Sequence, residues 1–197
     1  MKKVIGLLGK AGSGKSTAAA LLRDEYGAED LSIARPVKLI AIDVFGFTPE
    51  QVFGDATIKE AVDERWGVTP RKVLQDIAEA GRKHLGKEVW IRGILKHIRE
   101  SKHSLFVIED MRYEIEASLI GALNFASDQP IGGYVFRLTC EDSISTDDGT
   151  HPTEAEVDLV DPSLLTEDIL SHRTPGAEHL KKQIRAAMET IDLYPRE

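Results

Sequence analysis

A glycine-rich segment near the start of the sequence has the residue types and spacing needed to hold phosphate groups. Residues 9–16 read Gly-Lys-Ala-Gly-Ser-Gly-Lys-Ser and match the pattern G-x-x-x-x-G-K-[ST]. Glycines let a backbone wrap closely enough for successive N–H groups to point at one anion. The lysine of this pattern contacts the β- and γ-phosphates, and its hydroxyl residue serves Mg²⁺. The predicted ATP-binding residues are Lys10, Ala11, Gly12, Ser13, Gly14, Lys15, Ser16 and Thr17, with Ser16 also a predicted metal ligand.

The residues on either side of this segment are those that a phosphate-binding loop (P-loop) requires. An apolar run at residues 4–8 predicts a buried strand, and the Ala- and Leu-rich residues 16–26 predict a helix. The helix N-terminus then adds its positive dipole end to the anion site. The motif predicts phosphate binding and leaves the reaction open.

Two adjacent carboxylates, Glu109 and Asp110, follow a second apolar run at residues 105–108. Such a continuous run is typical of a parallel strand covered on both faces. A carboxylate at the carboxyl end of that strand can hold Mg²⁺ beside Ser16. The two residues point to opposite faces of the strand, and alternation alone does not decide which of them faces the metal. A turn or cap residue is the other interpretation of an Asp at this position.

Several basic residues stand near expected strand ends and helix starts. Transfer of a phosphoryl group between two nucleotides gathers much negative charge, so cations from several loops are expected around it. Any one of them alone could equally form a surface salt bridge. The candidates are Arg35, Lys38, Arg71, Arg92, Arg112 and Arg137.

The order of the predicted elements indicates an α/β fold with a mainly parallel sheet. Thr69-Pro70 is a helix-start signal, followed by apolar residues at helical spacing. Residues 45–68 are expected to be irregular, and residues 45–68 and 141–156 to form long connections over the site. Strands are predicted around residues 4–8, 31–33, 105–108, 133–138 and 157–160, and helices around residues 16–26, 36–44, 70–78, 90–98, 115–123 and 180–191.

Composition and charge exclude several classes of protein. The 197 residues are 42% hydrophobic and 29% charged, which is ordinary for a globular domain, and no window has the length of a membrane span. The one cysteine, Cys140, cannot form an internal disulfide or a cysteine zinc cluster, and it fits a reducing cytoplasm. A net charge of −8 excludes a uniformly basic nucleic-acid coat.

The charge is nevertheless unevenly distributed. Residues 65–102 hold ten Lys and Arg against four Asp and Glu, whereas residues 109–168 hold two against fifteen. The basic stretch could face an anionic ligand, or solvated helix faces could simply differ in sign. His151 and Glu154 lie in the acidic stretch, and two metal-ligand candidates without a third favour a capping arrangement over a metal site.

Motifs along almost the whole chain resemble the deoxynucleoside monophosphate kinases of tailed phages, which are related to the P-loop nucleoside monophosphate kinases. Arg35, Met111 and Thr153 are mild departures from the family pattern, and the part after residue 154 is the least similar. The motifs are the P-loop with Gly6-Leu7-Leu8 before it, Ala34-Arg35-Pro36-Val37-Lys38, Lys59-Glu60, the block from Asp63 through Trp66-Gly67 and Pro70-Arg71 to Leu74-Gln75, Val89-Trp90-Ile91-Arg92, Asp110-Met111-Arg112-Tyr113-Glu114-Ile115-Glu116, and His151-Pro152-Thr153-Glu154.

This resemblance implies γ-phosphoryl transfer from ATP to a deoxynucleoside monophosphate, with Mg²⁺ held by Ser16 and Asp110. Arg71 and Gln75 are four residues apart and share a helix face. Trp90 could stack on a base or anchor its helix in a core. The implied catalytic residues are Lys15, Asp110, Arg112 and Arg137, and the implied acceptor-binding residues are Arg35, Lys38, Arg71, Gln75, Trp90, Arg92, Arg112 and Glu116.

The resemblance also implies a three-layer α/β/α P-loop fold as a single domain over residues 1–197. Within it we expect a helical acceptor-binding insertion near residues 35–100 and a lid-like loop near residues 139–156, with Arg137 at the lid, that excludes water. The expected partners are small-molecule nucleotides, without a stable nucleic-acid complex or a membrane, in the cytoplasm of a host if the protein is encoded by a phage. A homodimer is compatible with the resemblance.

Three other functions are consistent with the P-loop. The first is a kinase of another small acceptor, such as dephosphocoenzyme A, and the second is an ATP-binding switch or motor module that hydrolyses ATP slowly with a partner. The third is a polynucleotide end kinase, which needs the basic groove that only residues 65–102 could offer. The bases accepted, and the choice between deoxyribose and ribose, have no marker in the sequence.

Overall fold

The computed structural model describes residues 1–125, 131–140, 156–171 and 177–196. Its residues form two compact units, which we call unit 1 and unit 2. Unit 1 comprises Met1–Ser32 and His97–Glu197, and unit 2 is the continuous stretch Ile33–Lys96. Unit 2 is therefore an insertion, in the chain, between two parts of unit 1.

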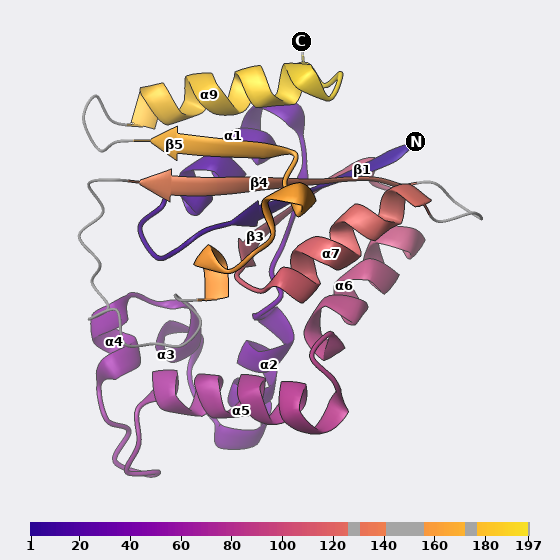
Figure 1. Cartoon of the computed structure of the whole chain (residues 1–197). Helices are drawn as coiled ribbons and strands as arrows, with labels where there is room; N and C mark the ends of the chain where they lie inside the picture. Colours follow the sequence, from indigo (N-terminus) through magenta and orange to yellow (C-terminus); the bar gives the residue numbers. More distant parts are fainter. Residues whose placement is uncertain (126–130, 141–155, 172–176, 197) are drawn as a thin grey trace. The chain divides into compact units, whose positions relative to one another are not determined.

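Unit 1 contains a parallel sheet with the strand order β2-β3-β1-β4-β5 among the described residues (Figure 1). The strand β1 lies between β3 and β4, with Leu8 opposite Met111 on one side and Arg137 on the other. Because all the strands run in one direction, their carboxyl ends meet at one edge of the sheet. The strands are β1 Lys2–Leu8, β2 Glu29–Leu31, β3 Leu105–Met111, β4 Ile131–Cys140 and β5 Glu167–Ser171.

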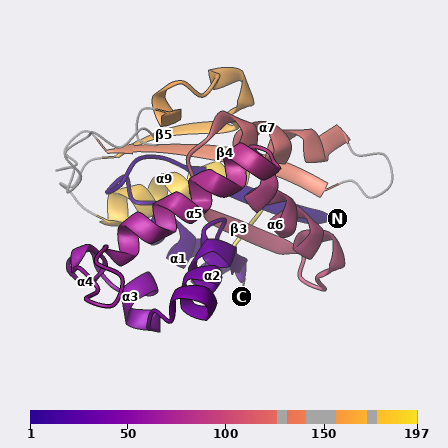
Figure 2. The same ribbon diagram turned by 90° about the horizontal axis from the view of Figure 1, so that it is seen from below.

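Helices cover both faces of this sheet. The helices α1 (Lys15–Tyr26) and α9 (Ala177–Thr190) pack on one face, in a core cluster that includes Ile5, Val107 and Phe136. The helix α7 (Glu114–Ala122) lies on the opposite face (Figure 2). It approaches closely enough that a Cβ at Gly133 would lie 1.9 Å from the carbonyl oxygen of Ile120. The result is a three-layer α/β/α arrangement, which confirms the predicted fold class.

Unit 2 is helical in its described structure. Thr69 caps α5 by accepting a hydrogen bond from the Lys72 amide, and Pro70 occupies the first turn, as the sequence predicted. The helices are α2 Arg35–Phe45, α3 Pro49–Phe53, α4 Ala56–Glu60, α5 Pro70–Leu85 and α6 Val89–Glu100, the last of which continues past the boundary at Lys96. A small core of Ala41, Phe47, Val52 and Val73 joins α2, α3 and α5. Short 3₁₀ turns in unit 1 are Leu123–Phe125 and Pro162–Leu164.

Three predictions of local structure were wrong, and one strand was not predicted. Residues 45–68 are not irregular, because they contain the short helices α3 and α4. The second strand lies at Glu29–Leu31 rather than at residues 31–33. Residues 156–158 are helical, so no strand exists at residues 157–160. The strand β5 was missed, because its exposed Asp168 and Leu170 make it an edge strand without a continuous apolar run.

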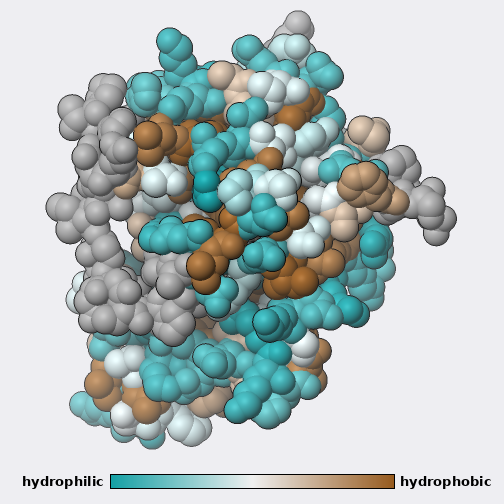
Figure 3. All heavy atoms as spheres, viewed as in Figure 1, coloured by the Kyte–Doolittle hydropathy of each residue, from teal (hydrophilic) through white to brown (hydrophobic). Residues whose placement is uncertain are grey.

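The surface of the described residues is mixed in character. On the face shown in Figure 3, hydrophilic residues alternate with hydrophobic ones over short distances. None of the helices found among the described residues combines the length and the apolar content that crossing a lipid bilayer would require.

Candidate active site

The P-loop joins the end of β1 to the start of α1, as the motif predicts. Gly12 and Gly14 have φ angles of 75° and 94°, in the left-handed region that side chains disfavour. A Cβ at Gly9 would lie 2.5 Å from the carbonyl oxygen of Leu138, so the loop runs directly against the backbone of β4. The three glycines are therefore required by the loop's own path.

The ammonium group of Lys15 lies inside this loop. Its Nζ donates hydrogen bonds to the carbonyl oxygens of Gly9 at 2.5 Å and Lys10 at 2.7 Å. The helix α1 starts at Lys15, and its N-cap residue, Gly14, supplies no side chain to the amides of the first turn. These amides and the positive end of α1 lie where the motif requires an anion site.

The exposed residue Lys10 of the loop forms an ion pair with Asp158. The Nζ–Oδ2 distance is 2.5 Å, and the two side chains are 45% and 63% exposed. An ion pair this exposed contributes little to stability, typically about 0–1 kcal/mol. It places the P-loop beside Asp158, which lies just after the segment predicted to form a lid.

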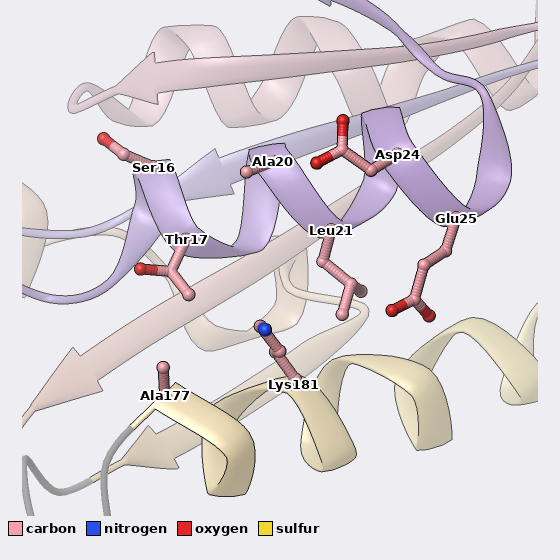
Figure 4. Close-up of a pocket in the computed structure, with 8 residues that line it drawn as sticks. All are labelled: Ser16, Thr17, Ala20, Leu21, Asp24, Glu25, Ala177 and Lys181. Atoms are coloured by element: carbon pink, nitrogen blue, oxygen red, sulfur yellow. The ribbon is translucent and has the colours of Figure 1, made fainter.

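An open groove of about 470 Å³ runs between α1 and α9, beginning at Ser16 and Thr17 (Figure 4). Lys181 of α9 points across it toward α1, and Asp24 and Glu25 lie at its far end. The groove thus starts at two of the predicted ATP-binding residues and continues along the helix that follows the P-loop.

The two predicted carboxylates lie at the end of β3, beside the last residues of β1. Asp110 accepts a hydrogen bond of 2.7 Å from the hydroxyl of Ser32, which follows β2. Glu109 acts electrostatically on Arg23 of α1, whose pKa is raised chiefly by its hydrogen bond to Asp24. The two neighbours therefore interact with different elements, and Asp110 is the one linked to the residue at which unit 1 leads into unit 2.

The oxygen ligands offered by these residues fit Mg²⁺. The ion favours a hydroxyl or one or two carboxylates, with nucleotide phosphates and water completing an octahedron. Ser16 is exposed at the start of α1, and Asp110 is only partly buried at the end of β3. The described residues contain no cluster of three or more histidine, cysteine, aspartate or glutamate side chains that could hold a metal ion.

Arg137, predicted at the lid, belongs to β4 and is held by the neighbouring strand. Its Nε donates to Oδ1 of Asp168 at 3.1 Å, and its NH2 group forms a second, short ion pair with Oδ2 of the same carboxylate. The hydrogen bond to Asp168 raises the pKa of Arg137, and Asp158 adds to this effect. The guanidinium is thus oriented by β5. The lid expected at residues 139–156 falls, from residue 141 to 155, outside the described residues, as do His151 and Glu154.

Glu116 has a structural use that the sequence did not indicate. Its carboxylate is buried, with the residue 3% exposed, and accepts hydrogen bonds from the backbone amides of Arg112 at 2.8 Å and Tyr113 at 3.1 Å. It therefore fixes the backbone from which the Arg112 side chain extends, between β3 and α7.

The predicted acceptor-binding residues of unit 2 come from three of its helices. Arg35 is exposed at the start of α2, and Lys38 lies with its ammonium 4.8 Å from the centre of the Phe53 ring. Arg71 forms an ion pair with Glu60 across α5 and α4. Gln75 follows one turn after Arg71 on the same helix, as predicted.

Trp90 and Arg92 lie on α6 and make contacts of different kinds. The indole nitrogen of Trp90 donates a hydrogen bond to α5, whereas Arg92 pairs at 2.8 Å with Glu88, the residue before α6, and is 72% exposed. The roles of these residues toward a substrate remain predictions.

Four further residues complete these arrangements and were not proposed as site residues from the sequence. They are Ser32, Lys59, Asp158 and Asp168, each of which contacts or electrostatically affects a predicted site residue. Lys59 could have been singled out, since it belongs to the family motif Lys59-Glu60, but the motif alone did not indicate a role for it. Asp168 lies on β5, which was not predicted, and Asp158 lies in the helical residues 156–158, where a strand was predicted.

A parallel α/β sheet with a P-loop between its middle strand and the first helix defines a P-loop protein. No family model matches the chain. A protein of Acanthamoeba polyphaga mimivirus, provisionally named a deoxynucleotide monophosphate kinase, is 31% identical over 94% of this chain and 96% of its own length. The chain therefore belongs to the deoxynucleotide monophosphate kinase family.

Two solved structures are similar over most of the chain. Dephospho-CoA kinase from Campylobacter jejuni has a TM-score of 0.47 at 15% identity, covering 98% of this chain and 96% of its own. Thymidylate kinase from Candida albicans has a TM-score of 0.42 at 14% identity, covering 97% and 92%.

Proposed function

We propose that this protein transfers the γ-phosphoryl group of ATP to a deoxynucleoside monophosphate, giving ADP and a deoxynucleoside diphosphate. The observation that supports it most directly is the Lys15 ammonium within the glycine loop at the start of α1. The name of the mimivirus relative supports the choice of acceptor.

In this mechanism the amides of the P-loop and Lys15 hold the β- and γ-phosphates of ATP. Ser16 and Asp110 would hold Mg²⁺, which neutralises charge on the β- and γ-phosphate oxygens when bound. An oxygen of the acceptor's phosphate attacks the γ-phosphorus in line. A bond forms between these two atoms, while the bond from the γ-phosphorus to the β–γ bridging oxygen breaks and ADP leaves with that electron pair.

The chain needs no dedicated general base for this step, because a phosphate monoester oxygen is already an anion near neutral pH. Arg112 and Arg137 are suited to stabilising the charge shared by donor and acceptor. The Asp168 carboxylate orients Arg137, and Glu116 fixes the backbone of Arg112. Positioning and charge stabilisation are therefore the main catalytic contributions of the chain.

The direct test is an ADP-release assay with Mg-ATP and a panel of deoxynucleoside monophosphates, ribonucleoside monophosphates and dephosphocoenzyme A. We expect turnover with one or more deoxynucleoside monophosphates well above the rate without an acceptor. The same panel identifies the accepted bases and the sugar preference. Turnover with dephosphocoenzyme A alone would indicate a different kinase, and equal background hydrolysis in every sample would exclude the monophosphate kinase.

A further inference from the structure

Unit 2 places Lys59 in the electrostatic field of two other basic side chains, each of which belongs to a different helix. Lys38 belongs to α2, Lys59 to α4 and Arg71 to α5, and α5 packs against both other helices. Partial burial lowers the pKa of the Lys59 ammonium, and the positive charges of Lys38 and Arg71 lower it further. The cluster is therefore a local concentration of positive charge that is partly shielded from water.

The carboxylates near this cluster neutralise only part of its charge. Glu60 pairs with Arg71, and Lys38 faces the ring of Phe53 rather than an acid. Across the described parts of the chain, Lys59 has no ion-pair partner, and Asp55 affects it only through a longer-range attraction. Partly buried like charges oppose one another and favour an added anion.

The contacts that do exist orient the cluster without occupying all its donors. The Phe53 ring holds the ammonium of Lys38 by a cation–π contact, which leaves its N–H groups able to donate elsewhere. A guanidinium has five N–H donors, so Arg71 can pair with Glu60 and still present an edge to a second anion. The two ammonium groups and the planar guanidinium together offer enough hydrogen-bond donors for the three terminal oxygens of a phosphate monoester dianion.

We propose that Lys59, together with Lys38 and Arg71, forms the binding site for the phosphate group of the monophosphate acceptor. This inference rests on the proposed function. It adds Lys59 to the predicted acceptor-binding residues and assigns the same phosphate group to all three cations. Lys59 binds substrate here and does not support the fold.

The test compares Lys59→Gln, which removes the charge, with Lys59→Arg, which keeps it. The control is Lys72→Gln, because Lys72 is an exposed lysine on α5 whose ammonium pairs with Asp76 of the same helix at 2.5 Å. For each protein, steady-state kinetics give the KM values for the acceptor and for ATP. Calorimetric titrations without ATP measure the binding of the preferred deoxynucleoside monophosphate and of its deoxynucleoside.

We expect Lys59→Gln to raise the acceptor KM and the monophosphate Kd about tenfold or more, since it removes one charge-assisted contact. The KM for ATP and the binding of the phosphate-free deoxynucleoside should change less than about twofold, within the scatter of such comparisons. Lys59→Arg should restore most of the affinity, and Lys72→Gln should resemble the parent protein. The Tm of Lys59→Gln should be unchanged or higher, because a repelled cation is lost, whereas a structural role requires a lower Tm.

If folded Lys59→Gln has an acceptor KM within about twofold of the parent value, Lys59 does not bind the acceptor phosphate, while the proposed kinase activity still stands. Equal losses for acceptor and ATP would also overturn this phosphate-binding role. If the parent protein transfers phosphate to no monophosphate, the proposed function itself fails, and that result is seen before any variant is made.

Discussion

The indole nitrogen of Trp90 donates a hydrogen bond of 2.9 Å to the carbonyl oxygen of Ala78 and so joins α6 to α5. The indole ring lies where a side chain at Gly81 would otherwise be, since a Cβ there would come within 2.2 Å of its Cζ2 atom. Of the two roles considered for Trp90, these contacts support a packing anchor. Stacking on a base remains a prediction.

This packing predicts opposite effects for the same substitution at two helical glycines. Gly81→Ala should destabilise the protein, because overpacking against Trp90 costs about 1–3 kcal/mol, more than the gain of up to about 1 kcal/mol in helix propensity. Gly93→Ala is the control, since a Cβ there meets nothing within 4 Å, and it should be neutral or stabilising. Urea unfolding measures both. Equal stability of the two variants would contradict the role assigned to Trp90.

Much of the fold could be predicted because its central elements carry strong patterns. The run Leu105–Ile108 is fully apolar and becomes the buried start of β3, and Thr69-Pro70 begins α5 as its residue types require. The helices α3 and α4 were missed because helices of five residues are too short to show a period. Their caps were nevertheless visible, since Thr48 and Gln51 form a capping box and Asp55 caps α4.

The site was predictable where function depends on a local motif, and not where it depends on partners distant in the chain. The P-loop is one continuous segment, so its residues follow from the sequence. The pairings of Arg137 with Asp168 and of Asp110 with Ser32 join different strands or strand ends, 31 and 78 residues apart. Such pairings require the strand order, which no single segment encodes.

Replacing Lys15 should abolish most of the phosphoryl transfer. Lys15→Ala removes the cation that lies within the P-loop, and losing one such group costs about 10²–10³ in kcat. It should also lower the Tm modestly, because the carbonyls of Gly9 and Lys10 lose a shared donor. Lys10→Ala is the control and should reduce activity far less, since Lys10 forms an exposed ion pair. Near-normal turnover by Lys15→Ala would remove the P-loop from the mechanism.

The choice between the adjacent carboxylates can be decided by the metal dependence. We expect Asp110→Asn to lower kcat and to raise the Mg²⁺ concentration needed for half-maximal rate, while Glu109→Gln stays close to the parent. Ser32→Ala should have a smaller effect of the same kind, because the Ser32 hydroxyl orients Asp110. Titrating Mg²⁺ at fixed ATP gives these values. A larger shift for Glu109→Gln would assign the metal to that residue instead.

Asp63 should make the stability of unit 2 depend on pH. Its carboxylate accepts hydrogen bonds from the Arg65 side chain, the Arg65 amide and Gln51, with the Arg65 side chain the leading reason that its pKa lies well below the ordinary value. A pKa lowered by folding means that the ionised form is bound more strongly in the folded state. This stabilisation is fully present above the unfolded-state pKa of about 4 and is lost as the pH falls toward the folded-state value.

The corresponding variant is Asp63→Asn, which should be less stable than the parent near neutral pH. The difference in unfolding midpoint should shrink as the pH falls below about 4, where the unfolded chain already binds the proton. Asp76→Asn is the control, because Asp76 is 62% exposed and pairs only with Lys72 among the described residues. A stability difference that stays constant from neutral to acidic pH would show that the carboxylate charge is not responsible.

The middle position of β1 in the sheet has a consequence for how the chain acquires its structure. β1 precedes both of its neighbours, β3 and β4, by roughly a hundred residues, and contacts so distant in the chain slow folding because a long loop must close first. During synthesis at about 5–20 residues per second, β1 would wait several seconds or more for a partner. The helices of unit 2 leave the ribosome within that interval, so the insertion can gain its short-range contacts before the sheet exists. The helices of unit 2 would then fold before the sheet of unit 1 forms. The strand β1, although it is made first, would be among the last elements to pair with its neighbours.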